Sequence, residues 1–229
     1  MRHQLLSSPL GHSYARTRKG YQGYRLEPGT DMVVEGFPRS ANTYAWYALR
    51  RTLEPNLTVR GHTHAASNVL AAVKNSVPTM LIIRNPDDAV ASLVQQAEGV
   101  SLEQAFRAYS RFHRACYSAS EGIYLAQFED VVQNFSNVVD DFYRQNSLCW
   151  PRYLGTEADE NAVRDAIDEA NRQRRGGSIR EAGVARPSKF RLPTAQILTG
   201  LTPRQETARR DAANVYRETL ARLNPRYQE

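Results

Sequence analysis

The sequence predicts an α/β domain of three layers, in which helices cover both faces of a central parallel sheet. Short apolar runs alternate along the chain with longer segments of helical composition, and this alternation is typical of parallel strands joined by helical crossovers. The length of 229 residues fits one such domain and is too short for two of ordinary size. We expect residues 1–28, which show no periodicity, to form an irregular leader, and residues 29–229 to form the domain.

Four strands are expected, each followed by a helix. The strands are predicted at 31–37, 57–60, 78–83 and 122–128. The helices are predicted at 43–52, 65–73, 86–96, 101–118, 131–144, 157–172 and 203–223. The segment 175–200 carries Gly, Pro, Ser and Arg and predicts a long loop.

Local signals support two of these helices. The run PTMLII at 78–83 is continuously apolar, as in a strand buried on both faces. Directly after it, Asn85 is a suitable N-cap and Pro86 fits the first helical position. Ser101 and Gln104 have the spacing of a capping box, so the next helix should begin there.

Composition narrows the class of protein. Hydrophobic residues make up 41% and charged residues 24%, which indicates a globular chain. Cys116 and Cys149 are too few for a disulfide framework and lack metal-ligand spacing, so we expect buried thiols in a reducing compartment. No apolar stretch is long enough to span a membrane and the first 20 residues contain no apolar signal region, so a cytoplasmic location is expected.

The net charge of +6 favours an anionic partner, which could be a nucleotide, a nucleic acid or an acidic polymer. A nucleic-acid-binding module would rest on this charge alone, because the chain has no recognisable basic–aromatic motif. We therefore expect no nucleic-acid partner.

The segment GFPRSANTY at 36–44 lies between the first strand and the first helix and is close to a phosphate-binding loop. Against G-x-x-x-x-G-K-[ST], Gly36 and Thr43 match, whereas Ala41 replaces the second Gly and Asn42 replaces the Lys. Backbone N–H groups at such a junction form an anion site, and Arg39 adds a fixed positive charge. An ordinary strand-to-helix turn would use similar residues. The missing lysine and the missing Walker-B acid disfavour an enzyme that uses ATP or GTP with Mg²⁺.

The same segment resembles the 5′-phosphosulfate loop of sulfotransferases that use PAPS (3′-phosphoadenosine 5′-phosphosulfate), P-[KR]-S-G-[TN]-T-[WFY]. The matching residues are Pro38, Arg39, Ser40, Asn42, Thr43 and Tyr44. Ala41 stands where the family has Gly, so either this loop avoids positive φ or binding is weakened.

A second segment, IIRNPDDAVAS at 82–92, resembles the family's 3′-phosphate motif R-[ND]-P-x-D-x-x-x-S. The matching residues are Arg84, Asn85, Pro86, Asp88 and Ser92. Arg84 leaves the carboxyl end of a buried strand, where α/β sheets bind ligands, and its guanidinium suits a phosphate. Ser92 lies two turns along the next helix, and its hydroxyl can donate a hydrogen bond to the same phosphate. The two motifs together imply the P-loop-like architecture of the sulfotransferase family.

Two fainter similarities add to these motifs, and together the resemblances cover residues 33 to about 143. Phe128 stands where the family's YED segment has Tyr, and Thr63 and His64 match a Thr-His pair. In the basic segment 174–191, Arg186, Ser188 and Lys189 are candidate donors to the 3′-phosphate, and a basic loop without a ligand is the alternative.

The resemblance implies transfer of a sulfuryl group from PAPS to a hydroxyl or amine without a metal, leaving adenosine 3′,5′-bisphosphate. The acceptor is expected to be a small molecule or a saccharide. Arg39 is the candidate for stabilising the bridging oxygen, and the loop residues Ser40 to Thr43, Ala41 included, hold the 5′-phosphate end. Tyr44 occupies the position that stacks on adenine, and His64 is the candidate general base, with His62 as the alternative. A catalytically inactive relative that binds PAPS or its product, or a P-loop nucleotide kinase, are the other readings.

Overall fold

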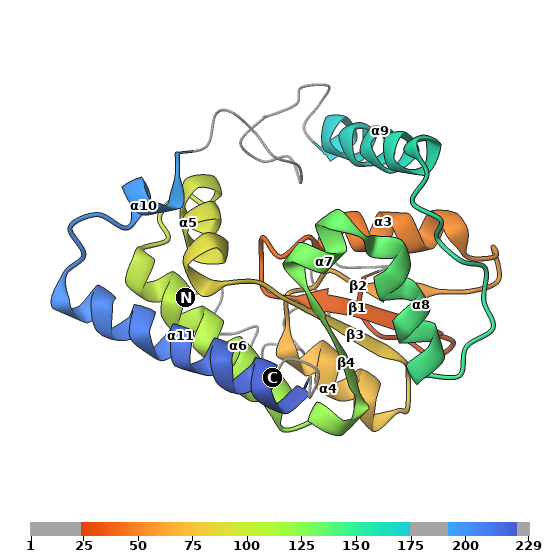
Figure 1. Cartoon of the computed structure of the whole chain (residues 1–229), viewed down its shortest axis with the longest axis horizontal. Coiled ribbons are helices and arrows are strands. Elements are labelled where there is room, and N and C mark those ends of the chain that lie inside the picture. Colours follow the sequence, from red (N-terminus) through yellow and green to blue (C-terminus); the bar gives the residue numbers. More distant parts are fainter. Residues whose placement is uncertain (1–23, 175–191, 224–229) are drawn as a thin grey trace.

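The computed structural model describes residues 24–174 and 192–223. Its centre is a four-stranded parallel sheet in the order β2-β1-β3-β4. The strands are β1 Met32–Gly36, β2 Val59–Gly61, β3 Thr79–Ile83 and β4 Ile123–Gln127. All four lie where the alternating pattern predicted them, so the α/β class with a central parallel sheet is confirmed (Figure 1).

Helices cover both faces of this sheet, which gives three layers. On one face, α3 Asn42–Thr52, α7 Phe128–Gln133 and α8 Phe135–Gln145 pack on strand residues such as Val34 and Ile82. On the other face, α4 Ala66–Lys74, α5 Pro86–Gln96 and α6 Leu102–Tyr117 pack on Leu81 and Leu125. Neighbouring residues of one strand serve opposite cores because side chains alternate across a strand.

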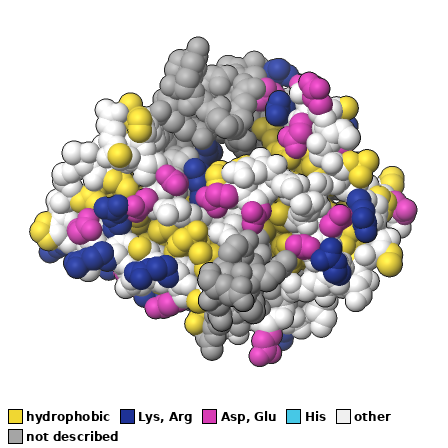
Figure 2. All heavy atoms as spheres, viewed as in Figure 1, with side chains coloured by type: hydrophobic (Ala, Val, Ile, Leu, Met, Phe, Trp, Pro, Cys, Tyr) yellow, Lys and Arg dark blue, Asp and Glu magenta, His cyan; other side chains and the backbone are white. Residues whose placement is uncertain are grey.

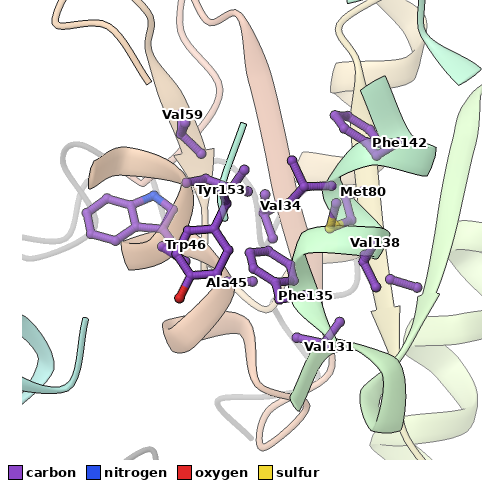
Figure 3. Close-up of a cluster of buried hydrophobic side chains, with 14 of the residues drawn as sticks. Val34, Ala45, Trp46, Val59, Met80, Val131, Phe135, Val138, Phe142 and Tyr153 are labelled. Atoms are coloured by element: carbon purple, nitrogen blue, oxygen red, sulfur yellow. The ribbon is translucent and has the colours of Figure 1, made fainter. Parts of the chain in front are cut away.

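The core under α3, α7 and α8 contains more aromatic residues than the core under α4, α5 and α6. Figure 3 shows Phe135, Phe142 and Tyr153 gathered with Met80 and Val34 at the centre of the layer. Apolar positions of β1, β3, α3 and α8 meet there, and this contact fixes α3, the helix after the predicted phosphate loop, against the sheet.

The helix starts follow the predicted capping signals. The Asn85 side chain accepts the Asp87 N–H at 2.9 Å, and Pro86 is the first residue of α5. At α6, Ser101 and Gln104 form both bonds of the capping box. Two long helices, α9 Glu157–Arg174 and α11 Pro203–Leu223, complete the fold; α11 lies alongside α6 and α9 packs on α3 (Figure 1).

Two expectations about secondary structure were wrong. The single helix expected at 131–144 is two helices, because Asn134 between α7 and α8 has φ −153° and ψ 59° and interrupts the ladder. Asn competes with helical hydrogen bonding, and here its side-chain oxygen accepts from the Ser136 hydroxyl at 3.1 Å. Of the long loop expected at 175–200, residues 175–191 lie outside the described residues, and the described part contains the short helix α10 Thr194–Ile197, held to α5 by the Thr194 hydroxyl donating to Asp88.

Residues 24–28, expected in the irregular leader, form neither helix nor strand and are bonded to the domain. The Tyr24 carbonyl accepts the Gly61 N–H at 2.6 Å, and the Leu26 N–H donates to Asn68 at 2.9 Å. Cys116 is buried as expected, whereas Cys149 is exposed, contrary to expectation.

Charges of both signs are intermixed on the face shown in Figure 2. In the described ranges, no helix has the length and apolar character needed to cross a membrane.

Candidate functional site

The order of the strands in the sheet reverses at the two predicted motifs. From β1 the chain moves to β2 on one side, whereas from β3 it moves to β4 on the other. In open α/β sheets, ligands bind outside the carboxyl ends of the strands where the order reverses in this way. The loop after β1 carries Arg39, and Arg84 directly follows β3, so both arginines belong to this reversal point.

The loop after β1 has a tight, left-handed backbone. Arg39 has φ 71° and Ala41 has φ 63°, both in the region that favours glycine. The loop therefore adopts positive φ at the position where the resembling family has Gly, in spite of the alanine. Ala41 is the N-cap of α3 and supplies no side-chain cap to the first N–H groups of that helix. Uncapped N–H groups at a helix start are donors for an anion.

Residues of the two motifs meet in one cluster. The Arg39 side chain donates from Nε to Ser92 Oγ at 2.9 Å and from Nη1 to Gln96 at 3.2 Å. Arg84 donates from Nη1 to the Arg39 carbonyl at 2.8 Å. Two hydrogen bonds thus join the motifs, which lie more than forty residues apart in the chain: the Arg39 side chain binds the buried Ser92 hydroxyl, and the Arg84 guanidinium binds the Arg39 main chain.

The Phe128 ring packs against Arg84 of the same cluster. The Arg84 guanidinium lies over the Phe128 ring at 4.0 Å from the centroid, a cation–π geometry. The Tyr109 hydroxyl donates to the main-chain carbonyl of Arg84 at 2.7 Å. The first contact restricts the direction of the Arg84 side chain, and the second fixes its main chain.

A second group brings the predicted base to the start of α3. His64 Nδ1 is 2.9 Å from the Gly36 carbonyl and 3.3 Å from the Asn42 amide nitrogen. The shorter contact is a hydrogen bond only when Nδ1 carries the proton, because a carbonyl only accepts, and the Asn42 amide hydrogens have the Gly36 and Phe37 carbonyls as acceptors. We therefore assign the proton to Nδ1. The basic lone pair is then on Nε2. Asn42 donates to the Gly36 and Phe37 carbonyls at 3.2 and 3.0 Å, so its amide braces the loop from within. His62, the alternative base, is 3.0 Å from the Thr43 hydroxyl through Nε2.

Glu35 was not predicted as a site residue. It is the residue before Gly36 on β1 and is completely buried. It accepts hydrogen bonds from the Thr63 N–H, the Thr63 hydroxyl, the His64 N–H and the Asn68 amide. Burial raises the pKa of Glu35 to about 7, and these four bonds act against that rise. The sequence signal was an acid inside a strand whose other residues are apolar.

Tyr44 lies apart from both groups. Its hydroxyl donates to Glu160 of α9 and is 3.3 Å from the Tyr153 hydroxyl, while its ring meets Phe135 edge-on. Burial, together with these hydroxyl contacts, raises the pKa of Tyr44 well above its ordinary value. The side chain thus joins α3 to α9.

The other predicted residues fall into two sets. Ser40 is completely buried, and its hydroxyl has no hydrogen-bond partner among the residues that the structure describes. A buried unpaired hydroxyl is costly, so this atom suits a ligand oxygen at the loop. Arg186, Ser188 and Lys189 lie outside the described residues. Within 24–174 and 192–223, no three His, Cys, Asp or Glu side chains are grouped so that they could hold a metal ion.

No protein-family model matches the chain, and no curated protein matches it in sequence. A similar solved structure is that of mouse sulfotransferase SULT7A1 complexed with PAP, at 10% identity over 88% of this chain and 91% of that chain, with a TM-score of 0.46. Identity this low carries no residue correspondence, so the roles of the site residues have to come from their own geometry.

Proposed function

We propose that this protein is a sulfotransferase that uses PAPS as donor, acts without a metal and modifies a hydroxyl or amine. The observation that carries the proposal is the cluster of Arg39, Arg84 and Ser92 at the strand-order reversal. Two sequence motifs that resemble the two phosphate sites of one nucleotide are far apart in the chain and adjacent in the fold. A chance match of either motif would not require that adjacency.

The residues present fit a donor with two phosphate ends. Arg84 and Ser92 are the proposed holders of the 3′-phosphate, with Phe128 setting the direction of the Arg84 guanidinium. The Ser40 hydroxyl and the uncapped start of α3 are the proposed holders of the 5′ end. When bound, PAPS supplies an activated sulfuryl group whose leaving group is a phosphate, a weak base that needs positive charge rather than a proton.

Arg39 is the proposed source of that charge. Its guanidinium is permanently protonated, so it stabilises negative charge and donates hydrogen bonds without releasing a proton. His64 is the proposed general base, since its proton on Nδ1 faces the Gly36 carbonyl and Nε2 is the nitrogen that accepts a proton from an acceptor hydroxyl or amine. Arg39 belongs to the loop after β1, and the His64 ring contacts the Gly36 carbonyl where that loop begins.

Calorimetric titration with adenosine 3′,5′-bisphosphate tests the donor site. We expect binding in the absence of Mg²⁺ and little binding of ATP with Mg²⁺; the reverse preference would identify a nucleotide kinase instead. Arg84→Gln should weaken bisphosphate binding at least about tenfold, because a charge-assisted hydrogen bond contributes about 1.5–3 kcal/mol. The matched control is Arg107→Gln, which removes an exposed arginine paired with Glu103 on α6 and should leave affinity unchanged.

A transfer assay separates the enzyme from an inactive relative. Labelled PAPS is offered with a panel of small hydroxyl, amine and saccharide acceptors, and His64→Gln is compared with the wild-type chain. Transfer that disappears in His64→Gln while bisphosphate affinity is kept supports the proposal. Bisphosphate binding without transfer to any acceptor would favour the non-catalytic binding protein.

A further inference from the structure

Glu35 is a completely buried carboxyl group that has no part in the proposed nucleotide site. It is the only acidic residue among the fully buried side chains of the described chain, and it lies in a strand whose residues are all buried. Transfer of a carboxylate from water into such a place is unfavourable unless hydrogen bonds replace its hydration. The donors around it show which part of the fold the carboxylate organises.

Those donors belong to the segment that carries the candidate base. Oε1 accepts from the Thr63 N–H at 2.9 Å and from the Thr63 hydroxyl, and Oε2 accepts from the His64 N–H at 3.0 Å. The remaining donor is the Asn68 amide in α4, at 3.0 Å from Oε1. Consecutive backbone N–H groups that converge on one anion form a nest, and here the anion is a side chain of the chain itself.

The backbone of this segment needs such support. His62 has φ 61° and His64 has φ 55°, so two residues with bulky side chains adopt the left-handed region within three positions. Such conformations are costly and persist only where the surroundings fix them. The His64 ring reaches the Gly36 carbonyl from this backbone, and Gly36 is the chain neighbour of Glu35. One strand end therefore holds His64 twice, through its main chain and through its ring.

We propose that Glu35 is a positioning residue for His64. By accepting the Thr63 and His64 N–H groups, its carboxylate keeps the His64 ring against the Gly36 carbonyl, which places the proton on Nδ1 and the basic lone pair on Nε2. The proposal rests on the proposed function in taking His64 as the base, but the orientation and tautomer of the ring are properties of the protein by itself.

The critical substitution is Glu35→Gln, which keeps the size of the side chain and replaces one acceptor oxygen by an NH₂ donor. Either orientation of the amide sets a donor against a donor, at the His64 N–H or at the Thr63 and Asn68 groups. The matched control is Asn68→Ala, which removes one hydrogen bond from the same carboxylate and the bond to the Leu26 N–H, and so lowers stability without removing the bonds of the Thr63 and His64 N–H groups.

The first readout is independent of activity: long-range ¹H–¹⁵N spectra of the histidine rings, with the His64 signals assigned from His64→Gln. We expect a single Nδ1–H tautomer in the wild-type chain and in Asn68→Ala, and a mixed or Nε2–H population in Glu35→Gln. A ring that exchanges between tautomers in the wild-type chain, or a Glu35→Gln spectrum equal to the wild type, overturns the proposal. Glu35→Asp, which withdraws the carboxylate by one methylene, carries the same expectation if Glu35→Gln does not fold.

The second readout is the division between binding and rate. Glu35→Gln should lower the transfer rate about tenfold or more while bisphosphate affinity stays within about threefold, and Asn68→Ala should change neither. Equal loss of rate in the two variants would mean that Glu35 acts only through stability and would refute the positioning role. Absence of bisphosphate binding in the wild-type chain would refute the proposed function alone, because the tautomer measurement does not depend on it.

Discussion

Replacing His113 by leucine should change how the stability of this protein responds to acid. His113 lies in α6, is completely buried, and has no hydrogen-bond partner for either ring nitrogen among the described residues. The rings of Tyr109 and Phe112 lie beside it, at 4.4 and 5.0 Å between centroids. Burial in these apolar surroundings lowers the pKa of His113 from 6.5 to about 3.

The sign of the effect follows from proton binding in the two states. Between pH 6.5 and 3 the unfolded chain binds a proton at this histidine and the folded chain does not, so the stabilising contribution is complete above pH 6.5 and is lost as the pH falls. One pH unit corresponds to about 1.4 kcal/mol, so the two units from pH 6.5 to 4.5 remove about 3 kcal/mol.

Glu35 acts in the opposite direction over the same interval. Its pKa in the folded state is raised from 4.5 to about 7, so its contribution is complete below pH 4.5 and is lost as the pH rises towards 7. The two contributions are of similar size, about 3 kcal/mol each. The two contributions therefore oppose each other between pH 4.5 and 6.5.

Urea unfolding at pH 4.5 and pH 6.5 measures this balance. With His113→Leu, only the Glu35 contribution remains of the pair, so the variant should gain about 3 kcal/mol relative to the wild type on moving from pH 6.5 to 4.5. The control is Phe112→Leu, which shortens the neighbouring buried side chain and should lose stability equally at both pH values. If His113→Leu and the wild type keep a constant difference across this range, His113 is not held neutral by burial and the reasoning is wrong.

Three further predictions concern backbone and contacts. Ala41→Gly should leave the free energy of unfolding within about 1 kcal/mol of the wild type, because relief of left-handed strain (about 1–2 kcal/mol) is offset by the greater freedom of glycine in the unfolded chain. Urea unfolding measures this difference, and a loss above about 2 kcal/mol would contradict the φ of 63° at Ala41. Gly61→Ala should lower the free energy of unfolding by about 2 kcal/mol or more in the same assay, because Gly61 has φ 136° and an added Cβ would overlap the Val34 carbonyl. An unchanged midpoint of urea unfolding would exclude this close approach. Tyr44→Phe should lower the free energy of unfolding by about 1 kcal/mol and speed proteolysis within α9, because the Tyr44 hydroxyl bonded to Glu160 joins that helix to α3. An unchanged rate of cleavage within α9 would show that this helix packs on α3 without the bond.

The strands and most helices were predictable because their signals are local. The run at 78–83 is apolar at every position, and β3 occupies Thr79–Ile83 with all its residues buried. Asn85, Ser101 and Gln104 cap their helices through bonds that span two or three residues. The break at Asn134 was missed because the apolar period continues through it, and only the backbone angles of that one residue interrupt the helix.

The contacts of the site were predictable only in part. The motifs at 36–44 and 82–92 indicated Arg39, Arg84 and Ser92, but the adjacency of these residues depends on the strand order, which sequence periodicity does not contain. The bond between Tyr44 and Glu160 joins residues 116 positions apart and has no motif. Glu35 had a signal, an acid in an apolar strand, but the Thr63 and His64 N–H groups that explain it come from another strand's loop.

Asn42 stands at the position where Walker loops have lysine, and it bonds to the turn in a way that lysine could not. Its side chain is 3% exposed, and its amide donates to the carbonyls of Gly36 and Phe37 within the turn. A lysine at this position could not meet both carbonyls and also extend its ammonium to a phosphate, because its donors lie at the end of a four-carbon stem. Positive charge beside this loop therefore comes from outside position 42, from Arg39 within the loop and Arg84 after the neighbouring strand. The Asn42 amide bonds the turn from within, and both charges are on guanidinium groups, which can bind phosphate oxygens in pairs.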